Sequence, residues 1–261
     1  MRAEILYNRD LGGGNYLMGL RDPEVAGSAL PGQFVMVKVV EEYDPLLRRP
    51  LAVYRIPEPE IVELIYKVIG RGTALLAQKR PGSVVDSLGP LGRGFTLEPP
   101  EGKALVVTGG IGIASVVMPA ERFPRERVVS FFGARTEADL VGESDLAAAS
   151  SEMFLATDDG SRGHRGFVTE PFENYLRAMD PSARARSRVL CCGPEPMMVR
   201  VARLAADYGV GACELAMERH MGCGVGACLG CVLPKAEGGY MTLCTVGPVV
   251  EASRVNWEAM A

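Results

Sequence analysis

Four cysteines near the end of the chain have the spacing of a metal-binding site. They are Cys223, Cys228, Cys231 and Cys244, all within 22 residues. The pattern C-x4-C-x2-C with a fourth cysteine farther along is typical of a plant-type [2Fe-2S] cluster. Glycines at positions 222, 224, 226 and 230 permit a tight loop whose backbone N–H groups point at the sulfurs. The pattern therefore predicts one [2Fe-2S] cluster bound by the four thiolates.

A structural zinc ion is the alternative that this spacing leaves open. Four thiolates also suit tetrahedral Zn2+, but zinc ribbons usually contain two short C-x2-C pairs. Here only Cys228 and Cys231 form such a pair, so we favour iron over zinc. His220 lies close to the loop, yet four cysteines already complete the ligand set. Cys191 and Cys213 stand in apolar runs, and we expect them to pack as small hydrophobic side chains.

A second candidate site follows from turns at the ends of apolar stretches. Gly110 and Gly112 lead from the apolar stretch 104–108 into a predicted helix, whose first N–H groups favour a phosphate. The dinucleotide fingerprint is incomplete, because Ser115 stands where a third glycine is expected. Further polar or glycine-rich turns follow the next three predicted strands, at Arg135, Asp159, Cys192, Gly193 and Pro194. Since the carboxyl ends of parallel strands share one edge, we expect one nucleotide-binding crevice there.

A third candidate site lies in the first hundred residues, where arginines precede one strand and a glycine-rich turn opens a short helix. The residues concerned are Arg48, Arg49, Pro50, Leu51, Ala52, Gly72 and Thr73. A guanidinium can bind a pyrophosphate in bidentate geometry, and a helix start adds N–H donors. This arrangement predicts a second anion site. Solvated arginines at a strand edge are the alternative interpretation.

The elements that position these residues are of two kinds. Short β-rich runs occur at 3–7, 16–20, 34–40, 51–56, 61–69 and 83–87, with one helix at 73–79. Their Gly and Pro punctuation predicts an antiparallel barrel or sandwich. Farther along, apolar strands at 104–107, 128–132, 153–156 and 189–192 alternate with helices at 113–122, 137–150, 169–179 and 195–208. Alternation of apolar strands with helices predicts a parallel, doubly wound α/β sheet.

Length and composition limit the number of domains and the class of partner. The chain has 261 residues, 48% hydrophobic and 23% charged, with a net charge of −4. We place a barrel at 1–98, an α/β domain at 103–212 and a cysteine-rich segment at 213–261. The Lys and Arg residues are scattered along the sequence, so it predicts no basic patch that would bind nucleic acid or an anionic membrane. The longest uncharged stretch, 104–120, is shorter than the ~20 residues of a membrane span. The first ten residues carry no secretion signal, and we expect a cytoplasmic protein.

The order of these motifs resembles that of the ferredoxin reductase superfamily. The motifs are R-P-L-A at 49–52, G-T at 72–73, G-G-I-G at 109–112, C-G-P-x-P-M at 192–197 and the terminal cysteine pattern. Within the superfamily, the chain is similar to the iron–sulfur electron-transfer subunits of type B dihydroorotate dehydrogenases. The likeness spans nearly the whole chain and includes L-G-P-L-G-R-G-F at 88–95 and T-D-D-G-S at 157–161.

The resemblance implies three cofactors and a partner subunit. FAD would lie against residues 49–52 and against Gly72 and Thr73, with NAD(H) in the α/β crevice and the [2Fe-2S] cluster on the four cysteines. The partner would be an FMN-containing dihydroorotate dehydrogenase catalytic subunit, in a heterotetramer with two copies of each chain. Electrons would pass from FMN through the cluster and FAD to NAD+ in pyrimidine biosynthesis. Flavin and nicotinamide carry the redox chemistry themselves, so we name no catalytic acid, base or nucleophile.

Two other functions share parts of this layout. The flavoprotein subunit of an NADH-dependent ferredoxin:NADP oxidoreductase or of a sulfhydrogenase has the same motif order. A zinc-stabilised nucleotide-binding module without redox activity is a candidate of a different class. The choice between NAD and NADP also stays open, because Arg135 can accept a 2′-phosphate. Ala52 departs from the family, which often has Ser or Thr at this position.

Overall fold

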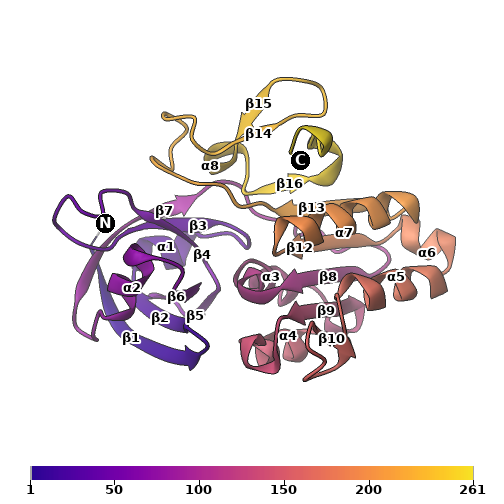
Figure 1. Ribbon diagram of the computed structural model, residues 1–261, viewed down its shortest axis with the longest axis horizontal. Helices are drawn as coiled ribbons and strands as arrows, with labels where there is room; N and C mark the ends of the chain where they lie inside the picture. The colour runs from indigo at the N-terminus through magenta and orange to yellow at the C-terminus, as the bar shows by residue number, and fades with distance from the viewer. Residues whose placement is uncertain (1, 261) are drawn as a thin grey trace.

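The computed structural model describes residues 2–260 as two sheets side by side, with a small C-terminal segment above both (Figure 1). The barrel and the α/β domain are the architecture that the sequence predicts. None of the helices within residues 2–260 is long and apolar enough to cross a membrane.

The N-terminal sheet has seven antiparallel strands in the order β4-β3-β7-β1-β2-β6-β5. Their bounds are β1 Arg2–Gly12, β2 Asn15–Arg21, β3 Phe34–Lys38, β4 Arg49–Ala52, β5 Arg55–Glu58, β6 Ile61–Lys67 and β7 Val84–Leu91. The sheet curls so that β4 contacts β6, which encloses a core of aliphatic side chains. Two short helices cover it, α1 (Pro23–Ser28) and α2 (Arg71–Ala77). The α1 helix was not predicted; it starts where the Asp22 carboxylate accepts a hydrogen bond from the Val25 N–H at 3.1 Å.

The second sheet also has seven strands, in the order β11-β10-β9-β8-β12-β13-β16. Their bounds are β8 Ala104–Gly109, β9 Val128–Ala134, β10 Glu152–Thr157, β11 His164–Arg165, β12 Arg188–Cys192, β13 Ala212–Ala216 and β16 Val249–Glu251. Every pair is parallel except β13 with β16. The helices are α3 Ile113–Ala120, α4 Glu143–Ala149, α5 Thr169–Ala178, α6 Pro181–Ala185 and α7 Glu195–Asp207.

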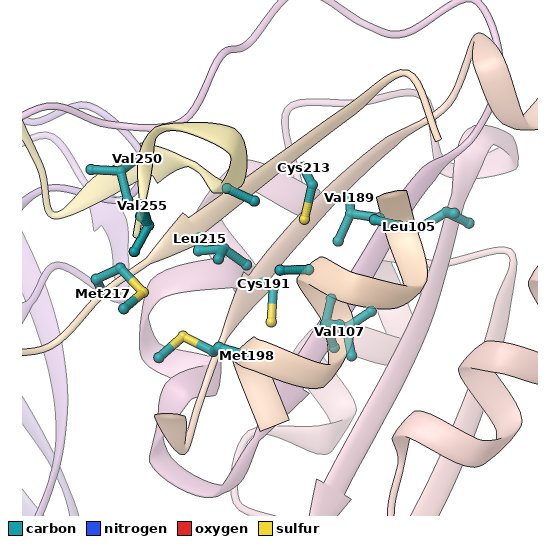
Figure 2. Packing of buried hydrophobic residues seen from close by; sticks show 14 of the residues in the cluster. Leu105, Val107, Val189, Cys191, Met198, Cys213, Leu215, Met217, Val250 and Val255 are labelled. Carbon is teal, nitrogen blue, oxygen red and sulfur yellow. The ribbon is translucent and has the colours of Figure 1, made fainter. Parts of the chain in front are cut away.

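Side chains alternate between the two faces of this sheet, which explains why its strands are apolar throughout. Leu105 and Val107 pack in one core with α5 and α7, while Ala104 and Val106 pack in another with α3 and α4. Figure 2 shows the first core, in which Cys191 and Cys213 lie among aliphatic side chains. The prediction that these two cysteines are packing residues is confirmed.

The C-terminal part is more interwoven with the α/β domain than the sequence suggests. It contains β14 (Val232–Pro234), β15 (Tyr240–Thr242) and α8 (Leu243–Val246). The boundary predicted between residues 212 and 213 falls inside β13, and β16 returns from the C-terminal part to the same sheet. Leu233 and Leu243 belong to the same core as α7. The segment is therefore anchored to the sheet at both of its ends.

Ion pairs and hydrogen bonds fix the barrel against the α/β domain. The buried Tyr54 hydroxyl donates to Asp145 of α4 at 2.5 Å. Lys67 of β6 pairs with Asp139 at 2.7 Å, and Arg55 pairs with Asp145 at 3.0 Å. Asp139 lies in a 3-10 turn, Glu137–Asp139, that precedes α4. The helix predicted over 137–150 is divided here because Gly142 has a φ of 76°.

Candidate functional site

One cavity of about 1010 Å³ lies where the barrel, the α/β domain and the C-terminal segment meet. The barrel contributes β4, the end of β6 and the start of α2, and the α/β domain contributes the start of α3. Residues 216–222, Cys228 and Gly230 line the wall on the C-terminal side. All six residues that the resemblance assigned to FAD lie around this cavity: Arg49, Pro50, Leu51, Ala52, Gly72 and Thr73.

The two arginines at the start of β4, Arg48 just before the strand and Arg49 as its first residue, have different surroundings. Arg48 pairs with Asp86 at 2.5 Å and also donates to the Asp86 carbonyl oxygen at 2.8 Å. Arg49 instead lies across Gly72, where an added Cβ would be only 2.2 Å from the Arg49 Nε. Glycine at position 72 is therefore what lets the Arg49 guanidinium reach the cavity wall. Arg48 holds strands together, while Arg49 is positioned to meet a ligand.

Thr73 fixes the turn at the start of α2. Its hydroxyl accepts hydrogen bonds from the N–H groups of Ile69 at 3.0 Å and Gly70 at 3.3 Å, and it donates to the Gly70 carbonyl oxygen at 3.0 Å. The hydroxyl is thus already engaged within the turn. The first backbone N–H groups of a helix have no partner within the helix, and those of Gly72 and Thr73 stand at the start of α2 on the cavity wall.

Two further residues on the cavity wall were missed by the sequence analysis. Ser115 of α3 lines the cavity, at the position where the fingerprint calls for glycine. Glu218 follows β13 and lines the cavity with its side chain exposed to solvent, and desolvation by the surrounding protein raises its pKa. Within residues 2–260, its carboxylate has no described hydrogen bond or ion pair. No motif distinguishes Glu218 from other acidic residues, so the sequence held no signal for it.

The turns predicted to bind a nucleotide meet at the carboxyl edge of the parallel strands. An added Cβ on Gly112 would lie 2.4 Å from the Cys192 carbonyl oxygen, and one on Gly109 would lie 2.8 Å from Pro194. The turn after β8, with Gly110 at a φ of 52°, thus packs directly against the turn at Gly193 after β12. Only glycine permits this approach.

A backbone hydrogen bond joins the turns after β9 and β10. The Asp159 N–H donates to the Arg135 carbonyl oxygen at 3.3 Å. The Asp159 carboxylate accepts from the hydroxyl and the N–H of Ser161 at 2.7 and 2.9 Å, which lowers its pKa. Arg162, next in the chain, pairs with Glu137 at 3.0 Å and Glu143 at 2.8 Å. The turns after β9 and β10 therefore carry both acidic and basic side chains, and Arg162 is paired with two of the acidic ones.

Cys192 ends β12 with its side chain turned into the protein. Its thiol is buried among residues of α3 and the sheet. Burial raises its pKa to about 12, opposed by a hydrogen bond with Ser115. The backbone around Cys192 therefore lies at the predicted crevice, while the sulfur packs beneath it.

Backbone N–H groups surround the sulfurs of the C-terminal cysteines. Cys223 Sγ accepts from Val225 and Cys228, both at 3.4 Å, and Cys244 Sγ accepts from Gly226 at 3.1 Å. Cys228 Sγ accepts from Gly230 at 3.5 Å, and Cys231 Sγ accepts from the N–H of Cys244 at 3.4 Å. The two donors to Cys223 lower its pKa to about 6, whereas burial raises the pKa of Cys244 to about 11 against the donor from Gly226. A thiolate is the form that binds a metal, so the loop is built to stabilise metal ligands.

Glycines shape the loop that carries the first three cysteines. Gly224 and Gly226 have φ values of 76° and 80°, in the left-handed region. An added Cβ on Gly224 would lie 2.8 Å from Met36 Cγ of β3, so the loop packs closely on the barrel. Cys228 is exposed and Cys223 half-buried, whereas Cys231 and Cys244 are buried.

The four sulfurs are arranged in two pairs. Side-chain contacts join Cys223 to Cys228 and Cys231 to Cys244. Across residues 2–260, no group of three or more His, Cys, Asp or Glu side chains has the geometry of a site for one metal ion. A [2Fe-2S] cluster divides its four thiolates between two irons, so a donor set of four cysteines in two pairs fits such a cluster.

Comparison with known proteins gives consistent results for the whole chain and for its C-terminal part. The family model for the iron-sulfur cluster binding domain of dihydroorotate dehydrogenase B matches residues 218–256. A dihydroorotate dehydrogenase B (NAD(+)) electron transfer subunit from Desulforamulus reducens is 37% identical over 249 residues, 93% of each chain. The corresponding subunit from Geobacillus kaustophilus is 43% identical over 232 residues, 86% of each chain.

Solved structures share the same architecture. The structure of an NADH-dependent reduced ferredoxin-NADP oxidoreductase superposes with a TM-score of 0.85 and 26% identity, covering 98% of this chain and 90% of that one. A ferredoxin NADP+ reductase from Neisseria gonorrhoeae with bound FAD and NADP gives a TM-score of 0.63 at 20% identity, over 84% of this chain and 94% of that one. The second likeness concerns the fold alone.

Proposed function

The chain belongs to the family of electron transfer subunits of dihydroorotate dehydrogenase B, and we propose that it passes electrons between an FMN-containing catalytic subunit and NAD(H) through a [2Fe-2S] cluster and FAD. One observation carries this proposal: a single cavity is lined both by the residues assigned to FAD and by one of the four clustered cysteines. Each part of the chain then has its own task, with FAD on 1–98, NAD(H) on 103–212 and the cluster on 213–261.

The cavity fits a flavin dinucleotide in size and in the chemistry of its lining. Ligand sites typically have volumes of about 300–1,000 Å³, with apolar walls and a few polar groups. Pro50, Leu51 and Ala52 supply an apolar wall for a ring system. Arg49 and the first amides of α2 supply the positive end that a pyrophosphate requires.

FAD can accept a hydride from a nicotinamide and can exchange single electrons with an iron–sulfur cluster. The protein groups bind and orient the cofactors. Gly110, Gly112, Gly193 and Pro194 form the closely packed edge against which NAD(H) would lie. Arg135 and Asp159 would border the same nucleotide. Ile111 and Ser115, at the start of α3, lie between this edge and the flavin cavity.

The cysteine loop would bind the cluster through its four thiolates. Five backbone N–H groups aimed at the four sulfurs offset the negative charge of a thiolate-bound centre. Cys223 and the exposed Val225 lie on the part of the loop that does not line the cavity. We assign this face to docking of the catalytic subunit, in a complex with two copies of each chain.

An electron transfer role in an NADH-dependent ferredoxin-NADP oxidoreductase is a second candidate. It is favoured by the TM-score of 0.85 with that structure. The higher identities, 37% and 43%, are with dihydroorotate dehydrogenase B subunits. We therefore assign the pyrimidine pathway first. A partner test separates the two candidates, because each complex requires a different second subunit.

Two measurements test the proposal. Anaerobically purified protein is expected to contain one FAD and two irons per chain, with no stoichiometric zinc, by visible absorption and metal analysis. Stoichiometric zinc without iron would contradict the cluster. Co-expression with the FMN-containing catalytic subunit is expected to yield a stable complex whose mass corresponds to two copies of each chain. Recovery with a ferredoxin-NADP oxidoreductase partner instead would move the chain to the second candidate.

A further inference from the structure

The four clustered cysteines differ in their relation to the cavity. Cys228 lines it, together with the residues assigned to FAD, whereas Cys223, Cys231 and Cys244 do not. Cys231 and Cys244 are each 2% exposed and face the core that they share with Leu233 and Leu243. Cys228 is thus the one cysteine of the four whose surface opens into the flavin cavity.

Two glycines leave the Cys228 sulfur uncovered on the cavity side. Gly222 and Gly230 both line the cavity. An added Cβ would lie 3.4 Å from the Cys228 Sγ at Gly222 and 3.5 Å from it at Gly230. These are van der Waals distances, so any side chain at either position would cover the sulfur without disrupting the loop. Neither glycine has a positive φ, so conformational freedom does not account for them.

The barrel contributes Arg49, Ala52 and Gly72 to the lining of the same cavity. No charged side chain stands on the loop between Met221 and Cys231. The part of the cavity wall that this loop contributes is therefore uncharged, and Cys228 is its only cysteine, while Glu218 and Arg219 line the wall next to it.

We propose that Cys228 is the cluster ligand that faces the flavin, and that electrons pass between flavin and cluster through its sulfur. The proposal rests on the function assigned above. Each passage would move one electron from the cluster to the flavin, and the catalytic subunit would reduce the cluster again before the second passage. Two electrons and one proton from solvent would then give the reduced flavin that returns a hydride to NAD+, which balances the two electrons of one NADH; the same steps would run in reverse when NADH is the donor. Gly222 and Gly230 act as positioning residues that keep the sulfur accessible.

The test replaces Gly230 by Ala and compares it with Leu229→Ala. Leu229 is the neighbouring residue, 63% exposed, and does not line the cavity. In Gly230→Ala the new methyl group occupies the space over the sulfur, and we expect FAD affinity to fall about tenfold, as overpacking of a fitted site does. Flavin fluorescence titration of deflavinated protein measures this affinity. Leu229→Ala is expected to bind FAD as the wild type does, and both variants are expected to retain iron.

A second pair of variants tests the route itself. Serine can replace a cysteine ligand while keeping an oxygen donor at the same place. We expect Cys228→Ser to shift the visible absorption band of the bound flavin and to slow cluster reduction after the flavin is reduced. Cys223→Ser should leave the flavin band unchanged. If a serine variant loses its iron, Gly230→Ala decides the question, since it keeps all four thiolates.

The outcomes separate this inference from the function on which it rests. Wild-type FAD affinity in Gly230→Ala, or a flavin band that responds to Cys223→Ser and not to Cys228→Ser, would overturn the assignment of Cys228. A wild-type chain that binds no FAD would overturn the proposed function first. A chain that binds FAD and holds iron, but shows no response at Gly230, leaves the function standing and removes Cys228 from the route.

Discussion

The cysteine loop is formed by one short stretch of the chain, whereas the flavin cavity is formed by elements that are far apart in the sequence. In the loop, the donors to the sulfurs are backbone N–H groups, and all four sulfurs come from 22 consecutive residues. In the cavity, the lining side chains come from β4, α2, α3 and the segment after β13. The loop therefore depends on local backbone conformation, while the cavity depends on how the barrel sits against the α/β domain. A change in the part of the loop that does not line the cavity is therefore expected to leave the cavity largely intact.

The largest effect is expected from removing a buried thiolate. Cys231→Ser is expected to abolish the EPR signal of the reduced cluster and to remove most of the iron, because Cys231 is buried and supplies one of the four thiolates that the cluster requires. FAD content should stay near that of the wild type, since Cys231 does not line the cavity. Loss of FAD together with iron would show that loop and cavity are one cooperative unit.

Replacing a residue of the cavity wall should lower FAD affinity and leave the iron content unchanged. Arg49→Ala removes a charge-assisted contact worth ~1.5 to 3 kcal/mol, so FAD affinity is expected to fall tenfold or more while iron content is unchanged. Fluorescence titration measures the loss. Arg48→Ala is the matched comparison, because Arg48 also lines the cavity but its guanidinium is already paired with Asp86. A larger loss of affinity in Arg48→Ala than in Arg49→Ala would remove Arg49 from the site.

The next prediction tests whether the cysteine loop requires the left-handed backbone conformation of Gly226. Its φ is 80°, and an added Cβ would lie 2.9 Å from Thr245 Cγ2. Gly226→Ala is expected to cost about 1–2 kcal/mol from the left-handed backbone alone, seen as a lower unfolding temperature and faster loss of iron. The double variant Gly226→Ala, Thr245→Ser removes the methyl clash and should recover part of the loss. No recovery would assign the whole effect to the backbone.

The smallest effect concerns the contact between the barrel and the α/β domain. A hydrogen bond and ion pair with Lys67 hold the pKa of Asp139 below its usual range. A lowered carboxyl pKa stabilises the fold above the unfolded-state pKa, near 3.9, and this stabilisation disappears as the pH falls through the lower folded value. Asp139→Asn is therefore expected to reduce the unfolding free energy by about 0.5–1 kcal/mol at pH 7.

Denaturant unfolding of both proteins across the acidic range checks the sign of this effect. The difference between wild type and Asp139→Asn should shrink as the pH approaches 3. A difference that grows on acidification would contradict the ion pair as its source. Lys67→Met is the matched variant from the barrel side and should give the same pH dependence.

The same difference between local and long-range contacts explains which features could be predicted from the sequence. The cysteine pattern is local, so spacing alone predicted the ligand set, and the apolar strands predicted both sheets. The three residues of β16 pair with β13 across the whole cysteine segment, a long-range contact that no local pattern reveals. Glu218 and Ser115 reach the cavity only because the domains meet there. The side chain of Cys192 points into the core because β12 alternates its faces, a register that the C-G-P motif does not encode.

The most direct test of the account is dihydroorotate-dependent reduction of NAD+ by the complex of this chain with its FMN-containing catalytic subunit. The isolated chain is expected to oxidise NADH with artificial acceptors but to show no activity on dihydroorotate. Adding the catalytic subunit should produce NADH from dihydroorotate and NAD+. Cys231→Ser should stop this reaction while the partner's FMN is still reduced by dihydroorotate. Undiminished NADH formation by the complex with Cys231→Ser would contradict the electron path through the cluster.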